Sequence, residues 1–381
     1  MLPAPTGDPV WIAEPRDLHQ MVRALAGEPC LAVDTESNSL FAYQERVCLI
    51  QFSTPTVDYL VDPLALQDLS SLEALFSNPN QLKIFHASEY DLICLKRDYG
   101  FEVSPVFDTM MAARILGEAQ VGLGNLLSLR FGIELNKKYQ RANWGTRPLP
   151  QMMRDYARLD THYLFALQEL LENELKEKGL WELALEDFRL ASDVDLQSAS
   201  TNGSNCWKVA GAARITGHEA AILQELCRYR DEQARKADLP HFKVLANELL
   251  VELCQKTPHS MDELQEFRHL NTRLLRKHGT GLLHAIEVGE AARPVIREKR
   301  TRPDDAFLKR LDAIKNWRKE FARELKVESD VVLPRTSMEE IAAKGPATRN
   351  ELQQVMDKTP WRFSRYGDQI LQVLNGGGKK K

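Results

Sequence analysis

Residues 30–36 read Cys-Leu-Ala-Val-Asp-Thr-Glu, a short apolar run that ends in two carboxylates separated by one residue. A run of this length is more typical of a buried strand than of a helix, and similar runs occur at residues 47–52 and 82–85. Residues 89–98 and 152–175 instead repeat their apolar side chains with a period near 3.6, which predicts helices. The pattern therefore predicts an α/β domain in the first half of the chain.

The second half contains an internal repeat at a constant offset of 88 residues. A polar segment at residues 191–205 separates the halves, and amphipathic helices are predicted over residues 219–237 and 305–325. The matched pairs include Leu245 with Leu333, Pro258 with Pro346, and Gly279 with Gly367. The period is too long for a solenoid, so two similar small helical domains are predicted. The shared glycine is predicted to end a helix in both copies.

The overall charge argues against a strongly basic nucleic-acid binder, but the charges are segregated. The chain of 381 residues carries 50 Lys and Arg against 54 Asp and Glu, a formal net charge of −4. Residues 28–110 hold thirteen acidic and four basic side chains, whereas residues 137–158 hold six basic and one acidic. Residues 291–323 hold eleven basic and five acidic side chains. Basic stretches are often only solvated helix faces, but here they are also consistent with a path for phosphates beside an acidic metal site.

Cysteine spacing and hydropathy bear on the compartment. The six cysteines form no C-x-x-C pair and several lie in apolar runs, which predicts buried thiols in a reducing compartment. The N-terminus has no secretory pattern, and no apolar stretch approaches the ~20 residues that a membrane span requires. We therefore expect a cytoplasmic protein without a membrane partner.

Three carboxylate clusters are candidates for chemistry. Asp34 and Glu36 lie two residues apart on a strand and point the same way, so they repel each other unless a cation lies between them. Asp91 follows the strand at residues 82–85, although Ser88 and Asp91 also fit a capping arrangement at a helix start. Tyr156 and Asp160 are spaced i, i+4 on one face of a helix. Each cluster alone is also compatible with an ordinary cap, turn or solvated side chain.

Together the clusters resemble the DEDD superfamily of 3′→5′ exonucleases, in the subclass that uses tyrosine. The related subclass has a histidine five residues before the last aspartate, where this chain has Asp155. Residues 135–149 are similar to the ribonuclease D family pattern L-x-K-x-x-Q-x-S-D-W-x-x-R-P-L, from which Ala142 and Asn143 depart. Residues 46–54 and 107–109 resemble two further family segments, the latter reading F-D-T. The two repeats resemble HRDC domains.

The resemblance implies a multidomain fold. We expect an α/β RNase H-like (DEDD exonuclease) catalytic domain followed by two all-α HRDC helical domains. The expected boundaries are residues 1–190 for the exonuclease domain, 191–214 for a linker, 215–290 for the first HRDC domain, 291–303 for a basic connector, 304–376 for the second HRDC domain and 377–381 for a flexible tail.

The resemblance also implies the chemistry. Asp34, Glu36, Asp91 and Asp160 are expected to hold two divalent cations, Mg²⁺ or Mn²⁺, which suit hard oxygen ligands. Tyr156 completes the catalytic set; a phenol with a pKa of about 10 is a poor base at neutral pH, so it is expected to orient a water. Thr161 and His162 after Asp160 resemble the eukaryotic exosome-associated relatives as much as the bacterial enzymes.

The implied activity is that of a 3′→5′ exoribonuclease. It would release nucleoside 5′-monophosphates from RNA with a free 3′ end, tRNA precursors among them, and act as a monomer. Two alternatives stay open: a DNA 3′→5′ exonuclease of the same superfamily, and a non-catalytic RNA-binding scaffold. No P-loop is present, so the chain is not itself a helicase.

Further side chains are candidates for contacts with the nucleic acid. Leu40 or Phe41 could wedge against the terminal base, although packing in the core is equally compatible with these residues, and His86 could instead be a core or loop histidine. The full predicted set is Leu40, Phe41, His86, Lys137, Lys138, Arg141, Trp144, Arg147, Arg297, Lys299, Arg300 and Arg302.

Overall fold

The computed structural model describes residues 2–196, 212–296 and 303–376. Most of the predicted linker lies outside these residues, as do the predicted RNA contacts Arg297, Lys299, Arg300 and Arg302 and the tail at residues 377–381. The described chain forms two compact units. One unit consists of residues 2–36, 47–196 and 303–376, and the other of residues 37–46 and 212–296.

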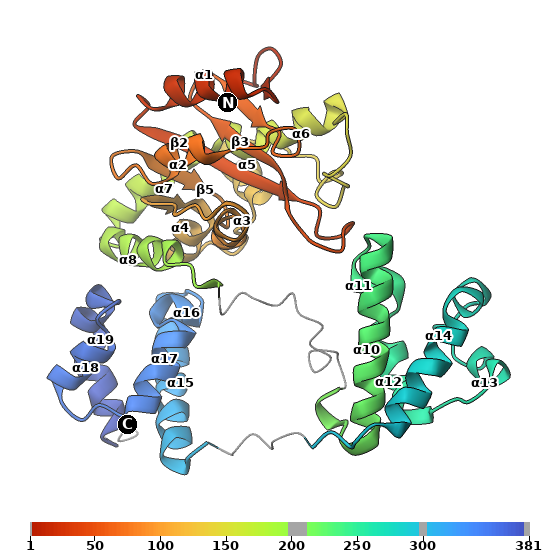
Figure 1. Ribbon diagram of the computed structural model, residues 1–381. Coiled ribbons are helices and arrows are strands. Elements are labelled where there is room, and N and C mark those ends of the chain that lie inside the picture. The colour runs from red at the N-terminus through yellow and green to blue at the C-terminus, as the bar shows by residue number, and fades with distance from the viewer. Residues whose placement is uncertain (1, 197–211, 297–302, 377–381) are drawn as a thin grey trace. The chain divides into compact units, whose positions relative to one another are not determined.

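The first unit is built around a six-stranded mixed sheet in the order β1-β4-β3-β2-β5-β6 (Figure 1). Its strands are β1 (Val10–Ile12), β2 (Cys30–Ser37), β3 (Val47–Ser53), β4 (Asp58–Val61), β5 (Leu82–Phe85) and β6 (Val106–Asp108). β1 pairs with β4, β2 with β5, and β5 with β6 in parallel, whereas β3 and β4 are antiparallel. The three predicted strands and the α/β class are confirmed. The strands β1, β4 and β6, of three or four residues each, were not predicted from the sequence.

Side-chain alternation along β2 explains why both faces of the sheet are covered. Leu31 and Val33 pack into one apolar core, whereas Ala32 packs into a second core on the opposite face. All seven residues of β3 are buried. A strand that is buried on both faces has a nearly continuous run of apolar residues, and this run is the pattern from which the strand at residues 47–52 was predicted.

Helices cover this sheet, and one of the predicted helices is divided. The helices are α1 (Pro15–Leu25), α2 (Glu73–Phe76), α3 (Glu89–Tyr99), α4 (Thr109–Leu116), α5 (Leu123–Phe131), α6 (Gln151–His162), α7 (Leu164–Glu177) and α8 (Trp181–Ser192), with a short 3₁₀ turn at Ser70–Leu72. The helical pattern predicted over residues 152–175 is confirmed, but it is divided between two helices, because α6 ends at His162 and α7 begins at Leu164. The apolar stripe continues across the break, so its periodicity could not reveal it.

The internal repeat is present in the structure. The first copy contains α10 (Gly217–Ala237), α11 (His241–Val244), α12 (Asn247–Lys256), α13 (Met261–Gln265) and α14 (Thr272–Ala291), preceded by a 3₁₀ turn at Ala212–Arg214. The second contains α15 (Asp305–Leu325), α16 (Ser329–Val332), α17 (Arg335–Lys344), α18 (Arg349–Val355) and α19 (Pro360–Leu374). Each helix of the second copy begins 88 residues after its counterpart.

The glycine that the copies share does not end a helix, so that prediction is wrong. Gly279 lies within α14 and Gly367 within α19. A Cβ atom at Gly279 would lie 2.7 Å from the sulfur of Met261, and one at Gly367 would lie 3.3 Å from the ring of Phe363. Close packing against a neighbouring side chain, rather than a left-handed backbone, explains the shared glycine.

Within the first unit, the second helical copy packs against α8 through a buried ion pair. The guanidinium of Arg362 is fully buried and lies 2.7 Å from carboxylate oxygens of both Glu186 and Asp187. The backbone N–H of Trp361 also donates to Glu186, at 2.7 Å. These contacts make the copy part of the same compact unit as the sheet.

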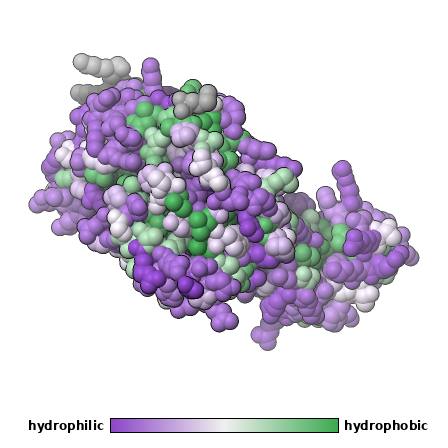
Figure 2. Space-filling model, turned by 90° about the horizontal axis from the view of Figure 1, so that it is seen from above, coloured by the Kyte–Doolittle hydropathy of each residue, from purple (hydrophilic) through white to green (hydrophobic). Residues whose placement is uncertain are grey.

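Among the described residues, no helix combines the length and the apolar character that a membrane crossing requires. Figure 2 shows a face on which hydrophilic residues predominate around smaller hydrophobic areas.

Candidate active site

Three of the four predicted metal ligands meet at the carboxyl end of β2. Asp34 and Glu36 project from this strand and Asp160 from α6, and one carboxylate oxygen of each lies within 4.8 Å of the others. Asp91, in the first turn of α3, lies close enough to raise the pKa of Asp34 and Glu36 but is not in this tight group. Segments far apart in the sequence thus bring four carboxylates to one region.

Burial and mutual repulsion oppose ionisation of these carboxyl groups. Burial, followed by the charges of neighbouring carboxylates, raises the pKa of Asp34 and Glu36 well above the usual range. Burial is also the largest cause that raises the pKa of Asp91 and of Asp160 to about 7. Bound divalent cations would remove this repulsion, and an all-carboxylate donor set fits Mg²⁺ or Mn²⁺.

Asp91 is fixed by Thr35, the residue between Asp34 and Glu36. The Thr35 hydroxyl donates to Asp91 Oδ1 at 2.5 Å and the Thr35 backbone N–H donates to the same oxygen at 3.2 Å. The capping arrangement predicted from Ser88 and Asp91 does not form, because the Ser88 hydroxyl donates instead to Asp108. The helix nevertheless begins where predicted.

Tyr156 lies beside the carboxylates and is held by two aromatic rings. Burial, followed by the charges of Asp160, Glu36 and Asp34, raises its pKa further above the usual phenol range, so the hydroxyl keeps its proton at neutral pH. The Tyr139 ring packs edge-on against Tyr156 with centroids 5.8 Å apart, and the Trp144 ring lies at 6.1 Å. Trp144 is only 1% exposed, so its predicted contact with RNA is corrected: its ring belongs to the core.

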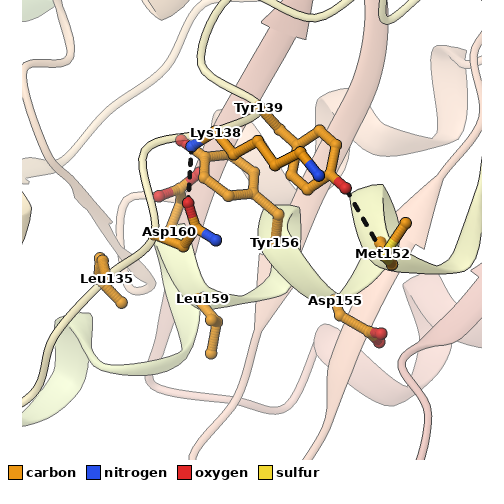
Figure 3. Close-up of a pocket in the computed structure, with 9 residues that line it drawn as sticks. Leu135, Lys138, Tyr139, Met152, Asp155, Tyr156, Leu159 and Asp160 are labelled. Atoms are coloured by element: carbon orange, nitrogen blue, oxygen red, sulfur yellow. Dashed lines mark hydrogen bonds between the residues drawn. The ribbon is translucent and has the colours of Figure 1, made fainter.

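A cavity of about 270 Å³ adjoins Tyr156 and Asp160 (Figure 3). The segment at residues 135–139 forms the other side of the cavity. Figure 3 shows the Tyr139 and Tyr156 rings on the same side of α6, with Asp155 pointing away from them. The exposed side chain of Lys138 lies on the lining, as Asp160 does, and its ammonium group is 5.3 Å from the centroid of the Tyr139 ring.

A buried charge network anchors α6 to the sheet. Arg158 donates to Asp58 Oδ2 through Nε at 2.9 Å and through Nη2 at 2.6 Å. Asp58 also accepts a hydrogen bond from Ser53 at 2.7 Å and lies 3.1 Å from His162 Nδ1. Although burial acts to raise the pKa of Asp58, hydrogen bonds from His162, Ser53 and Arg158 hold it below the usual range. The network fixes the helix that carries Tyr156 and Asp160.

The basic stretch at residues 137–158 contains both exposed side chains and side chains that pair with carboxylates elsewhere in the domain. Lys137, Lys138 and Arg141 are exposed, which is compatible with the RNA contacts predicted for them. Arg147 makes two hydrogen bonds of 2.7 Å to Asp62 and others to backbone carbonyls, which give it a structural role, and its contact with RNA stays a prediction. Of these three exposed side chains, Lys138 lines the cavity beside Tyr156.

Three other predicted RNA contacts have different surroundings. Leu40 and Phe41 both lie in the second unit, where Leu40 is exposed and the ammonium group of Lys243 lies 3.9 Å from the centroid of the Phe41 ring. His86 Nδ1 lies 2.8 Å from the hydroxyl of Thr109, which itself donates to the carbonyl of Phe85. The imidazole therefore donates through Nδ1, and burial lowers its pKa to about 4, so it is neutral and presents no charge to a phosphate.

The residues that sequence reasoning missed support the candidate site from outside. Thr35 binds Asp91, and Asp58 binds α6 through Arg158. Asp108 binds the turn before α3, and the Tyr139 ring packs against Tyr156. Only Asp108 had a usable signal, because it lies in the F-D-T segment that resembles the family. The others require knowledge of which distant segments meet.

Comparison with family models identifies the domains. Residues 9–176 match the model described as a 3′-5′ exonuclease, and residues 219–286 and 307–374 match the HRDC domain. The chain is 34% identical over 268 residues to Protein RRP6-like 2 of Arabidopsis thaliana, covering 67% of this chain and 31% of that protein. The chain spans about a third to a half of the length of the first curated relatives it matches.

Bacterial proteins match over more of their length. Ribonuclease D of Gluconacetobacter diazotrophicus is 28% identical, over 74% of this chain and 72% of that protein. The crystal structure of Escherichia coli RNase D superposes with a TM-score of 0.70 at 23% identity, covering 97% of this chain and 99% of that chain, a likeness of fold. The chain belongs to the family of 3′-5′ exonuclease-domain proteins with HRDC domains that includes ribonuclease D and Rrp6.

Proposed function

We propose that this protein is a 3′→5′ exoribonuclease that hydrolyses phosphodiester bonds one nucleotide at a time. The observation that carries the proposal is the meeting of Asp34, Glu36 and Asp160 within 4.8 Å, with Tyr156 beside them. Membership of a family that contains ribonucleases supports RNA rather than DNA as the substrate.

Asp34, Glu36, Asp91 and Asp160 would hold two divalent cations, Mg²⁺ or Mn²⁺. When bound, such cations supply an activated water and neutralise charge on the phosphate in the transition state. The protein supplies the scaffold: β2, α3 and α6 hold the carboxylates before any ion arrives. In the reaction, the water oxygen bonds to phosphorus as the bond from phosphorus to the 3′ oxygen breaks, which releases a nucleoside 5′-monophosphate.

Tyr156 would orient the attacking water rather than deprotonate it. Because the hydroxyl keeps its proton at neutral pH, it can donate or accept a hydrogen bond, but it cannot act as the general base that removes a proton from the water. Its ring is held by Tyr139 and Trp144, so the position of the hydroxyl is fixed before substrate binds. Fixed orientation of this kind is what a water-positioning group requires.

The cavity beside Tyr156 would receive the 3′-terminal part of the RNA, with Lys137, Lys138 and Arg141 binding its backbone. Leu40, Phe41 and His86 stay predicted contacts, His86 as a neutral hydrogen-bonding group. Precursor tRNA as the substrate, a monomeric state, a cytoplasmic location and the domain boundaries proposed from the sequence also stay predictions.

The test uses matched RNA and DNA oligonucleotides with free 3′ tails, incubated with the full chain in Mg²⁺, Mn²⁺ or EDTA. We expect metal-dependent shortening of the RNA in single-nucleotide steps, with nucleoside 5′-monophosphates as the released product. Shortening of DNA alone would favour the DNA exonuclease, and binding without any shortening would favour the non-catalytic scaffold.

A further inference from the structure

Asp108, at the end of β6, is a fully buried carboxylate whose two oxygens accept five hydrogen bonds. Oδ1 accepts from the backbone N–H groups of Ala87 at 3.1 Å, Met110 at 2.8 Å and Met111 at 3.1 Å. Oδ2 accepts from the backbone N–H of Ser88 at 2.7 Å and from the Ser88 hydroxyl at 2.8 Å. With both oxygens engaged in this way, Asp108 is placed to organise backbone rather than to bind a cation.

The sheet brings Asp108 to this position. β5 and β6 are parallel, with Phe85 in register with Asp108. The chain leaves β5 after Phe85, so residues 86–88 turn directly beside the Asp108 carboxylate. The cap of α4 accounts for the contacts with Met110 and Met111, but it does not account for the three donors that come from Ala87 and Ser88.

The turn that Asp108 holds has an unfavourable backbone conformation. Ala87 has a φ of +64°, the left-handed region that a side chain with a Cβ atom rarely adopts. Such a residue persists only where its surroundings impose the conformation, and the N–H groups of Ala87 and Ser88 both point to Asp108. Loss of the carboxylate would therefore release this turn.

The turn determines where Asp91 lies. Ser88 precedes the first residue of α3 and Asp91 is in the first helical turn, so the direction of the helix start fixes its Cα atom. On the opposite side, Thr35 binds Asp91 Oδ1 through its hydroxyl and its N–H. The turn at residues 86–88 thus sets the backbone position of Asp91, and Thr35 sets the position of its carboxylate. A small shift of either segment would therefore move this metal ligand.

We propose that Asp108 is a positioning residue for the divalent-cation site: by holding the strained turn at Ala87 and Ser88, it sets the position of Asp91. The inference rests on the proposed function, since it concerns a ligand of the same site. The alternative is that Asp108 only caps α4 and stabilises the fold, without affecting the metal site.

The test compares Asp108→Asn with Glu186→Gln in the full chain. Glu186 is also a buried carboxylate, but it pairs with Arg362 at α8, and no contact joins it to Asp91 among those described. The measurements are Mn²⁺ affinity by titration calorimetry, thermal stability, and kcat and KM on 3′-tailed RNA. Replacing a carboxylate oxygen by an NH₂ group places a donor opposite the donors of Ala87 or Ser88.

We expect Asp108→Asn to weaken Mn²⁺ binding by about 10- to 100-fold, as loss of an outer hydrogen-bonding partner of a metal ligand typically does. kcat should fall by a similar factor while KM for RNA changes less. Glu186→Gln should lower stability and leave Mn²⁺ affinity unchanged. Equal Mn²⁺ affinity in Asp108→Asn and the wild type would overturn the proposal.

A second variant tests the mechanism and guards against misfolding of the first. Glycine adopts a φ of +64° without strain, so Ala87→Gly introduced together with Asp108→Asn should restore part of the lost Mn²⁺ affinity. Failure of this rescue would contradict the role of the strained turn.

If Asp108→Asn does not fold, Ser88→Ala provides a milder test, because it removes a single hydroxyl donor to Asp108. This variant should still weaken Mn²⁺ binding, and unchanged Mn²⁺ affinity would overturn the proposal. If the wild type binds Mn²⁺ but leaves RNA intact, the proposed function fails while the affinity comparison still decides the role of Asp108.

Discussion

At the scale of single residues, the carboxylates and the tyrosine could be named from the sequence, but their supports could not. The D-x-E spacing and the i, i+4 pair of Tyr156 and Asp160 are local patterns that survive without knowledge of the fold. Thr35 and Asp58 act through contacts with segments 56 and 100 or more residues away. No local pattern carries that information.

Removing the Tyr156 hydroxyl tests its role in orienting the water. We expect Tyr156→Phe to keep the ring packing against Tyr139 and Trp144, because only the oxygen is lost. kcat should fall by about 10- to 1000-fold, the range expected for loss of one oriented polar group at a reacting centre, while the Kd for RNA changes little. Single-turnover kinetics and fluorescence binding give the two quantities. Full activity in Tyr156→Phe would rule out this role.

Repulsion among the carboxylates gives the metal-free protein a pH-dependent stability. The pKa of Asp91 and of Asp160 is about 7 in the folded chain against an ordinary 3.8, so the folded state holds more protons than the unfolded state between these values. Stability in EDTA should therefore fall as pH rises from about 4 to about 7. Mg²⁺ should raise Tm more at pH 8 than at pH 5, because ionised carboxylates bind it.

Thermal unfolding with EDTA or Mg²⁺ at the two pH values measures this effect. Asp160→Asn serves as the matched variant, since it removes one repelling charge without changing the size of the side chain. In EDTA at pH 8 this variant should be more stable than the wild type. An equal gain in Tm from Mg²⁺ at both pH values would contradict the account.

At the scale of elements, charge counting misjudged which basic residues are available. The stretch at residues 137–158 holds six basic side chains, but Arg147 and Arg158 are bound to Asp62 and Asp58, and Arg154 lies over the ring of Trp11. A count along the sequence cannot separate a guanidinium that joins two elements from one that faces solvent. Strands β2, β3 and β5 and helix α3 were predictable from local apolar patterns, whereas α1 and α8 were not predicted although they have 11 and 12 residues.

The contact between α8 and α19 should contribute strongly to stability. Arg362→Ala leaves the carboxylate of Glu186 buried without its partner, and loss of one member of a buried ion pair typically costs about 3–5 kcal/mol. Arg349→Ala is the matched control, because Arg349 pairs with Asp368 on the surface, where a pair contributes about 1 kcal/mol or less. Urea unfolding gives both free energies, and equal losses would show that the buried pair has no special weight.

At the scale of the whole molecule, the repeat was the most informative feature of the second half. Its constant offset predicted two copies, and the structure starts five helices in each copy at that same offset. The sequence could not show that the second copy packs on α8, because Arg362 and Glu186 are separated by 176 residues. The net charge of −4 combines an acidic stretch at residues 28–110 with basic stretches at residues 137–158 and 291–323.

The central claim, that the carboxylate cluster hydrolyses RNA from its 3′ end, is tested most directly by one comparison. RNA labelled at its 5′ end is incubated in Mg²⁺ with the wild type, with Asp34→Ala or with Asp160→Ala, after circular dichroism has confirmed that both variants are folded. The wild type should give a ladder that shortens by single nucleotides, and the variants should leave the RNA intact. Shortening at the wild-type rate by either folded variant would contradict the assignment.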